Sequence, residues 1–350
     1  MMNKVQAKQH DVSLDMVRIF GVALVIAGHS HFPWPLEKAI YSFHMPLFFF
    51  LSGMLFRNSP PVTLARKKFK TLIIPYVMAS LLTACLYGVA SGAVLTPDFY
   101  LSIPPGIFRA QSPDGLFWNS PLWFLPALFW CFMAMALLSR FVGDRLGPLL
   151  AVPAGILLVG WAATHREYLP LGLDTASEGL IFVSLGFLFT QVLAKIRLNS
   201  IRLGLLAAAS FFVWLILFAI HPDYFVVAHL KVFPLWLWLA LSLSGTVAVV
   251  AFFTFACDVL PERVVSSSRQ SLVKVAAYTF PLYMFHKPII TLLAEWLGRA
   301  GYDPQSSYPF LFLCGTAITL AGVLLFEFCT PRFYALVVGG RSTGIRRSSR

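Results

Sequence analysis

The sequence is poor in charged side chains. Asp, Glu, Lys and Arg make up 12% of its 350 residues, whereas 58% are hydrophobic and the mean hydropathy is +0.75. Soluble proteins usually contain about 25% charged residues, and a soluble domain of this size could not cover so much apolar surface, because its outside must remain wetted. The composition therefore excludes an ordinary water-soluble domain and indicates a protein whose solvent is the lipid bilayer.

Signatures of several kinds of site are also missing. The five cysteines lie far apart, within or at the ends of apolar runs, and form no CxxC pair. We therefore expect buried free thiols rather than a zinc centre or a disulfide framework. The sequence contains no phosphate-binding P-loop, dinucleotide fingerprint, HExxH motif or nucleophile elbow. No metal and no permanently bound cofactor is expected, and neither an internal repeat nor a separate soluble domain is visible.

Acidic residues are few as well, since 15 Asp and Glu stand against 27 Lys and Arg, which gives a net charge of +12. An excess of this kind can indicate nucleic-acid binding. Here the positive residues lie in short loops between apolar runs, where they set the orientation of a protein in the membrane. The lipid bilayer is thus the predicted partner, and nucleic acid is not.

Long apolar runs dominate what is present. About 20 apolar residues cross the hydrocarbon core, and on this rule the sequence predicts an all-α, polytopic membrane protein with about ten transmembrane helices. The predicted spans are 13–31, 39–56, 71–95, 121–141, 148–164, 176–194, 203–220, 232–257, 275–297 and 307–329. Turn-forming residues separate several of them, namely HFPWP at 31–35, NSPP at 58–61, IPPG at 103–106 and the stretch from Gly298 to Pro304.

The basic residues predict the orientation. If the N-terminus is inside, most of the 27 Lys and Arg lie on the inner side, Lys287 lies within a span, and the outer loops hold Lys38, Arg109, Arg166, Lys231 and Arg299. This asymmetry predicts a multi-pass protein of the inner or plasma membrane with both termini in the cytoplasm. The chain then divides into a cytoplasmic N-terminal segment (1–12), a ten-helix membrane domain (13–331) and a basic cytoplasmic tail (332–350).

Two polar residues interrupt the first span. Arg18 and His29 are eleven residues apart, so they share one helix face about 16 Å apart along the axis, with Arg18 toward the cytoplasm. An ionisable side chain at such a depth is costly and therefore needs a reason. Arg18 can be an interfacial arginine paired with Asp15, and His29 a histidine at the outer headgroup level. The alternative is that both serve a reaction.

Two further spans carry histidines. His44 lies in the outer part of the second span, one short hairpin from His29, and two histidines brought close together can share a proton or a substrate. His286 and Lys287 lie in the middle of the ninth span, beside Pro288. A lysine at that depth requires a cavity or a nearby carboxylate. Glu178 and Glu327 lie close to span ends, where interfacial exposure accounts for them.

A basic cluster follows the second span just inside the membrane. Arg66, Lys67, Lys68 and Lys70 can serve topology and attract anionic lipid, at about 1 kcal/mol per residue. Fixed cations also suit phosphate oxygens. The cluster is therefore a candidate seat for the phosphates of a cytoplasmic, nucleotide-like donor.

These features occur in a characteristic order along most of the chain. The Arg18–His29 spacing leads into ALVIAGHSHFP, followed by IYSFHMPLFFFLSGML, ARKKFKTLIIPY, SPLWFLPALF at 120–129 and YTFPLYMFHKPII. Together they resemble the acyltransferase-3 family of multi-span membrane acyltransferases, particularly its fucose 4-O-acetylase-like branch. The resemblance implies an O-acyltransferase that moves an acetyl group from acetyl-CoA to a sugar hydroxyl of a cell-surface or exported glycan.

The resemblance also implies roles for individual residues. His29 would be the base or acyl relay and Arg18 its electrostatic support, while His44 and Trp123 would line the site. The residues near the acyl-CoA phosphates would be Arg66, Lys67 and Lys70. His286 and Lys287 are further candidates for substrate contact. The carbohydrate acceptor would be modified either by this chain alone or with a separate extracytoplasmic or polysaccharide-synthesis partner.

Two questions stay open at this stage. CoA is cytoplasmic, whereas the predicted topology places His29 and His44 toward the outside, so either the thiol-bearing arm of the donor enters a cavity or the acetyl group is relayed across the membrane. In addition, intramembrane His, Lys and Arg mark transport paths as well as enzymes. The main alternative is therefore a transporter or flippase for a sugar or lipid-linked substrate, and a structural scaffold leaves the polar residues unexplained.

Overall fold

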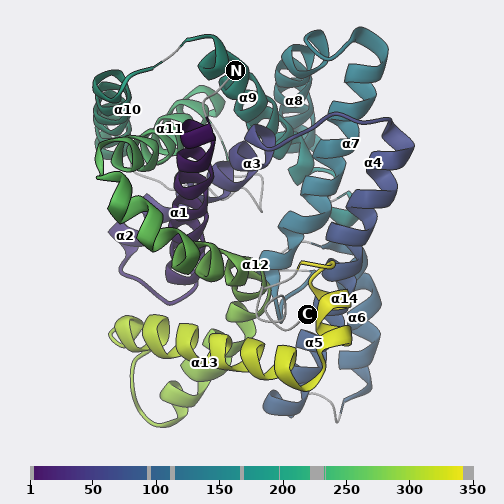
Figure 1. Cartoon of the computed structure of the whole chain (residues 1–350). Coiled ribbons are helices and arrows are strands. Elements are labelled where there is room, and N and C mark those ends of the chain that lie inside the picture. The colour runs from purple at the N-terminus through teal and green to yellow at the C-terminus, as the bar shows by residue number, and fades with distance from the viewer. Residues whose placement is uncertain are drawn as a thin grey trace.

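The computed structural model of the chain describes residues 4–92, 96–110, 115–165, 169–196, 198–220, 232 and 234–341, of which 4–11 and 163–165 by backbone alone. These residues contain helices and no strand (Figure 1). The helices are α1 (Lys4–Gly28), α2 (Trp34–Tyr41), α3 (His44–Met54), α4 (Pro61–Lys68), α5 (Ile74–Ser91), α6 (Pro97–Arg109), α7 (Phe124–Val142), α8 (Leu146–His165), α9 (Thr175–Lys195), α10 (Ser200–Ile220), α11 (Leu235–Val259), α12 (Glu262–Arg299), α13 (Tyr308–Cys329) and α14 (Pro331–Val337).

Among the described residues, six helical segments are long and apolar enough to cross a membrane. They are Pro61–Ser91, Ser120–Val142, Pro170–Lys195, Ser200–Ile220, Leu235–Val259 and Tyr308–Cys329. Each contains most of a predicted span, so the expectation of an all-helical membrane protein is confirmed for the described chain. Helices α1 and α12 cover two more predicted spans but carry charged residues, and α8 contains a shorter apolar stretch. Ten crossings and cytoplasmic termini stay predictions.

The predicted second span, 39–56, is not one helix. α2 ends at Tyr41, and α3 begins at His44 and has 11 residues, which is about 16 Å of helix, or half the hydrocarbon thickness. The cause is Pro46, which has no N–H to bond the carbonyl of Ser42 four residues earlier. That carbonyl instead accepts a 2.7 Å hydrogen bond from the Ser242 hydroxyl of α11.

Three of the four predicted breaks between helices are confirmed, and the break predicted at IPPG, residues 103–106, is wrong. α2 begins at Trp34 after HFP, α4 begins at Pro61, and α12 ends at Arg299, whereas Pro104 and Pro105 lie inside α6. α6 continues through both prolines, and its Phe99 ring lies 6.4 Å from the buried ring of Trp118. The break comes later, at Ala110, whose φ of 62° ends the helix.

The cysteines are free, as predicted, but not all of them are buried. Cys131 and Cys257 are buried, Cys314 is half-buried, and Cys85 and Cys329 are exposed on α5 and α13. A thiol is a small apolar group that helix surfaces facing lipid tolerate as well as a core does. The burial expected for Cys85 and Cys329 is therefore wrong.

Two sets of helices build the molecule. In the first, α3 packs closely against α9, and α7 and α8 cover α9; in the second, α1 packs against α11 and α12, and α10 packs on α11. α13 contacts α12 and lies across the lower end of the molecule in Figure 1. The long α12, with 38 residues, thus connects the α1 set with α13.

Candidate active site

α1 ends directly before its histidine. The His29 backbone N–H still bonds the carbonyl of Ile26 (3.1 Å), and the Ser30 hydroxyl donates to the same carbonyl (2.7 Å). His31 then takes a left-handed conformation with φ of 59°, which stops the helix. This local sequence places the partly buried imidazole of His29 at the very end of α1, beside the loop that leads to α2.

The imidazole closest to His29 belongs to α12. The rings of His29 and His286 have centroids 5.3 Å apart, with an angle of 36° between their planes. His29 also lies within electrostatic reach of Lys287, His44 and His31. We call these five residues, His29, His31, His44, His286 and Lys287, the histidine end. The sequence predicted that His29 and His44 lie close together. The structure also brings His286 and Lys287 of α12 to this place.

His44 reaches this group through a tyrosine. The Tyr41 ring lies 4.9 Å from the His44 ring and 6.4 Å from the His29 ring, edge to face in both pairs. Nδ1 of His44 is 2.8 Å from the carbonyl of Ile40, and the side chain is buried. His44 therefore packs against Tyr41, which in turn packs against His29.

His286 is the most enclosed member of the histidine end. Its side chain is 0% exposed, and its Nδ1 lies 2.9 Å from the carbonyl of Tyr283 and 3.1 Å from that of Leu282. Both partners are acceptors, so Nδ1 carries the proton and Nε2 keeps a free lone pair. Nε2 is buried and has no hydrogen-bond partner within the described part of the chain. A fixed, unpaired base nitrogen thus lies next to the ring of His29.

Asn119, which the sequence analysis did not select, holds this part of α12. Pro288 has no N–H for the carbonyl of Met284, and Nδ2 of the fully buried Asn119 donates to that carbonyl at 2.8 Å. The signal was present, because every proline inside a helix leaves a carbonyl unpaired four residues earlier. Tyr283 adds a second brace through its hydroxyl, which donates to the carbonyl of Pro121.

Lys287 interacts electrostatically with Glu37 of α2, so the predicted carboxylate near this lysine is found. Glu37 and Lys287 are both half-buried, while His31 is exposed. His31 and Asp303 of the loop after α12 also interact. The histidine end therefore has a polar rim that carries both signs of charge.

Trp123 is a core residue rather than part of this group. Its side chain is 4% exposed, and its ring packs at 6.2 Å from Phe49 and 6.3 Å from Phe124. It belongs to a short 3₁₀ turn, Ser120–Trp123, that lies directly before α7. None of the histidines whose side chains are described packs against its ring, so its contribution here is to hold the turn that accepts the Tyr283 hydrogen bond.

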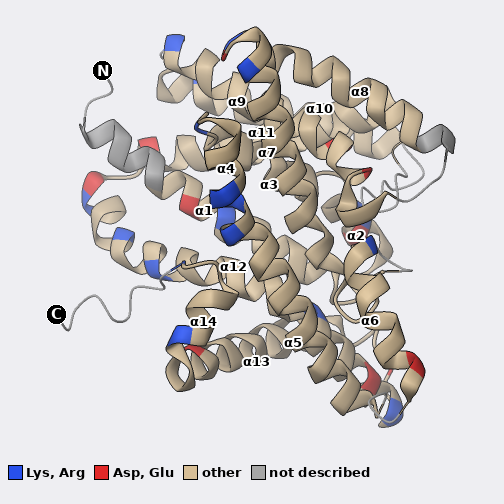
Figure 2. Ribbon diagram, turned by 90° about the vertical axis from the view of Figure 1, so that its right-hand side faces the viewer, with Lys and Arg blue, Asp and Glu red and all other residues tan. Residues whose placement is uncertain are grey.

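The predicted donor residues lie apart from the histidines. Arg66, Lys67 and Lys70 are exposed on α4 and on the π-helical turn Phe69–Ile73 that joins it to α5, and Figure 2 shows the Lys and Arg gathered along α4. Lys68 is half-buried, with Nζ 3.6 Å from the centre of the Phe132 ring. Arg18 forms an ion pair with Asp15 at 2.8 Å, as the simpler interpretation predicted, and about 16 Å of helix separates it from His29.

Glu178 contradicts its prediction. It was expected to be exposed at a span end, but its side chain is 1% exposed, and neither carboxyl oxygen has a partner among the residues described. α9 begins at Thr175 and is buried over its first turns between α3, α7 and α8, so the end of the apolar run is not the end of the packed region. Glu327 is half-buried and accepts a 3.1 Å bond from the Tyr278 hydroxyl.

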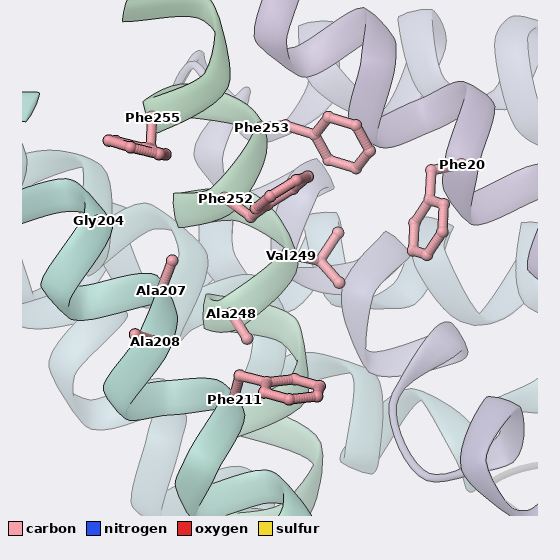
Figure 3. Close-up of a pocket in the computed structure, with 10 residues that line it drawn as sticks. All are labelled: Phe20, Gly204, Ala207, Ala208, Phe211, Ala248, Val249, Phe252, Phe253 and Phe255. Atoms are coloured by element: carbon pink, nitrogen blue, oxygen red, sulfur yellow. The ribbon is translucent and has the colours of Figure 1, made fainter. Parts of the chain in front are cut away.

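A cavity of about 360 Å³ lies between α1, α10 and α11, away from the histidines (Figure 3). Its lining is apolar and contains none of the residues predicted for the site: Phe20, Gly204, Ala207, Ala208, Phe211, Ala248, Val249, Phe252, Phe253 and Phe255. Such a lining offers neither a base nor a charge. This cavity is therefore not a candidate for acid–base chemistry, whereas the histidine end carries groups that could support it.

Comparison with known proteins identifies the family of the chain. A family model of an acyltransferase domain, acyltransferase 3, matches residues 11–328, which is nearly the whole chain. No curated protein and no solved structure matches it. The matched region contains most of α1, the whole of α12 and every residue of the histidine end.

Proposed function

This chain belongs to the acyltransferase 3 family of membrane acyltransferases, and on that premise we propose that it moves an acetyl group from acetyl-CoA to a sugar hydroxyl of a cell-surface or exported glycan. The observation that carries the proposal is the pairing of His29 with His286 at the end of α1. A partly exposed imidazole backed by a second, buried imidazole is suited to take and return one proton. Acyl transfer to a hydroxyl group requires this proton transfer.

The proposed reaction needs a base and then an acid. A neutral His29 takes the proton of the sugar hydroxyl while the hydroxyl oxygen attacks the thioester carbonyl carbon. The new C–O bond forms, the C–S bond breaks, and the CoA thiolate takes the proton back from the His29 imidazolium. Atoms and charges balance without any further reactant.

His286 suits the part of a positioning residue. Its Nδ1 proton is held by two carbonyls, so its buried Nε2 keeps a lone pair that can accept a hydrogen bond. An acceptor beside His29 favours the tautomer and orientation in which the other ring nitrogen of His29 is free to act as the base. The positive charge of Lys287 supports the negative charge that develops on the thioester oxygen.

The helices that carry the site also indicate the approach of the donor. α1 carries Arg18 and then His29, and α12, which packs against α1, carries His286. In the proposed orientation the basic residues Arg66, Lys67 and Lys70 face the cytoplasm and hold the phosphates of CoA. The thiol-bearing arm then extends along α1 and α12 toward the histidine end.

A carbohydrate acceptor fits the rim of the histidine end. Sugar hydroxyls both donate and accept hydrogen bonds, and the rim presents the imidazole of His31, the carboxylates of Glu37 and Asp303, and the ammonium of Lys287. The mixed charge suits a neutral, polyhydroxylated substrate better than an apolar one.

The test compares cells that lack the protein with cells that produce the wild type, His29→Gln or Arg332→Gln. Arg332 is exposed on α14 and lies outside the histidine end, so Arg332→Gln is the control. We expect mass spectrometry of surface glycans to show acetyl groups with the wild type and Arg332→Gln, and a loss of about 10²- to 10⁴-fold in transfer rate with His29→Gln at equal abundance in membranes.

Two results would contradict the proposal. Glycans that are identical with and without the protein would exclude sugar acetylation. Movement of a sugar or lipid-linked substrate across membrane vesicles without consumption of acetyl-CoA, unaffected by His29→Gln, would favour the transporter.

A further inference from the structure

A half-buried arginine, Arg341, lies shortly after α14. Nη1 of Arg341 donates to the carbonyls of Thr71 (2.9 Å) and Val338 (3.0 Å), and its guanidinium carbon lies 3.7 Å from the centre of the Phe280 ring. The side chain thus touches the π-helical turn before α5 and the middle of α12. It lies beyond residues 11–328, the region that the acyltransferase family model matches.

The backbone before Arg341 forms a turn that directs its side chain toward Thr71. Gly339 and Gly340 have φ values of 67° and 74°, where residues with a Cβ are strained. A Cβ on Gly339 would also lie 2.9 Å from the Cα of Thr71, so the turn fits closely against the π-helical segment. Thr71 is a prepared acceptor, because residue 75 is a proline and cannot supply the usual helical N–H to its carbonyl.

This arginine adds positive charge where positive charge is already present. Burial, and next the charge of Arg18, lower the pKa of Arg341 to about 10, so it remains a cation at neutral pH. Lys68 interacts electrostatically with both Lys67 and Arg341. Asp15 forms an ion pair with Arg18, and its single charge does not balance Arg18, Lys68 and Arg341 together. Repulsion of this kind is relieved when an anion binds.

We propose that Arg341, Arg18 and Lys68 form a seat for a phosphate group of the acyl donor. The inference rests on the proposed function and extends it to a residue of the C-terminal segment. Arg suits the role, because a guanidinium binds phosphate through two parallel N–H donors. The two hydrogen bonds that Arg341 donates to described residues both come from Nη1, so its other guanidinium nitrogens are the candidates for contact with a phosphate.

The position of this seat matches the shape of a CoA thioester. Phe280, which Arg341 covers, precedes His286 by six residues on α12, about 9 Å along the helix. Arg18 precedes His29 by eleven residues on α1, about 16 Å. Both helices thus lead from the seat to the histidine end, as the pantetheine arm leads from the phosphates of CoA to its thioester.

The experiment uses full-length protein in nanodiscs of phosphatidylcholine and compares two donors, acetyl-CoA and the phosphate-free S-acetylpantetheine. The variants are Arg341→Gln, Arg341→Lys and the control Arg332→Gln, which removes an exposed arginine from α14. We expect Arg341→Gln to weaken CoA binding and to lower kcat/KM for acetyl-CoA about tenfold to hundredfold. Arg341→Lys should restore part of this loss, Arg332→Gln should change little, and no variant should alter the reaction with S-acetylpantetheine.

Each other outcome has a distinct meaning. An equal loss with both donors would show that Arg341 serves only the packing of the C-terminal segment, and unchanged CoA binding would overturn the inference while leaving the acetyltransferase intact. If added phosphatidylglycerol, and not CoA, distinguishes Arg341→Gln from the wild type, the seat binds lipid headgroups and the donor inference is wrong. Absence of transfer and of CoA binding in the wild type itself would instead overturn the proposed function. If Arg341→Gln does not accumulate, Arg341→Lys carries the same comparison.

Discussion

The α3–α9 contact and the α1–α12 contact join helices in opposite ways. Between α3 and α9 the backbones nearly touch, since a Cβ on Gly53 would lie 1.9 Å from the carbonyl oxygen of Val183, and one on Gly186 would lie 2.0 Å from that of Phe50. Phe49 and Phe50 fill the remaining space and are 1% exposed. The contact between α1 and α12 also contains apolar residues, but at its His29 end it brings two imidazole rings together, and Nε2 of His286 has no partner among the described residues.

The difference separates support from chemistry. Within a bilayer, helices associate through close packing of small residues, because lipid tails are as apolar as the side chains they replace. A glycine contact leaves no room for a substrate but fixes the helices around it. Burying polar groups in the α1–α12 contact costs free energy. In membrane proteins, polar groups at such positions usually serve a function. We expect substitutions in the first contact to remove the folded protein and those in the second to remove activity.

The largest effect is expected from Gly53→Ala. The new Cβ would collide with backbone, which cannot rotate away, so α3 and α9 must separate, at about 1–3 kcal/mol or more. The matched control is Gly160→Ala in α8, where a Cβ meets nothing within 4 Å. Thermal unfolding of the purified protein should show a much lower Tm for Gly53→Ala and no loss for Gly160→Ala. Equal Tm values would mean that the glycine contact is not what holds α3.

A smaller and different effect is expected from His286→Gln. Because His286 is fully buried and acts through His29, kcat should fall about a hundredfold, at the lower end of acid–base contributions, while the KM for the acceptor and the Tm stay close to wild type. The pH profile of kcat should also move, which loss of packing alone would not cause. Arg332→Gln, which changes an exposed residue of α14, serves as the control. An unmoved pH profile in His286→Gln would show that the buried ring does not influence His29.

The smallest effect is expected at the rim. The backbone N–H groups of Gln305 and Ser306 donate to the Asp303 carboxylate and lower its pKa below 3.8. A lowered folded-state pKa stabilises the turn above the unfolded value, and this stabilisation is lost as the pH falls through the folded value. Amide exchange at Ser306 should accelerate below about pH 4 in the wild type and in Gln305→Ala, which keeps the backbone donors. Asp303→Asn should lack this acid step, and if it keeps the step, another group controls the turn.

The sequence predicted what depends on local composition. Runs of apolar residues predicted the positions of α7, α9, α10, α11 and α13, because the length of a spanning helix is set by the bilayer. It failed where a distant residue decides the local structure. The Ser42 carbonyl that Pro46 leaves unpaired finds its partner in the distant Ser242, and α6, which continues through Pro104 and Pro105, packs its Phe99 ring near Trp118.

The site shows the same division. His29, His286 and Lys287 could be selected individually, since each is a polar residue in an apolar run. Their convergence could not be predicted, because it depends on how α12 packs against α1. The burial of Glu178 was missed for a similar reason, as hydropathy marks the end of an apolar run and not the end of a packed interior. Arg341 looked like one more residue of a basic tail until its hydrogen bond to Thr71 was seen.

The length of α12 has a mechanical consequence. Its 38 residues form about 57 Å of helix, nearly twice the thickness of the hydrocarbon core. Its first turns, with Arg263 and Lys274 exposed, and the turn that carries His286 therefore belong to one strut. A displacement of the charged end of α12 is therefore transmitted along the helix to the imidazole of His286 beside His29. Pro281 and Pro288 are the positions at which the helix can bend.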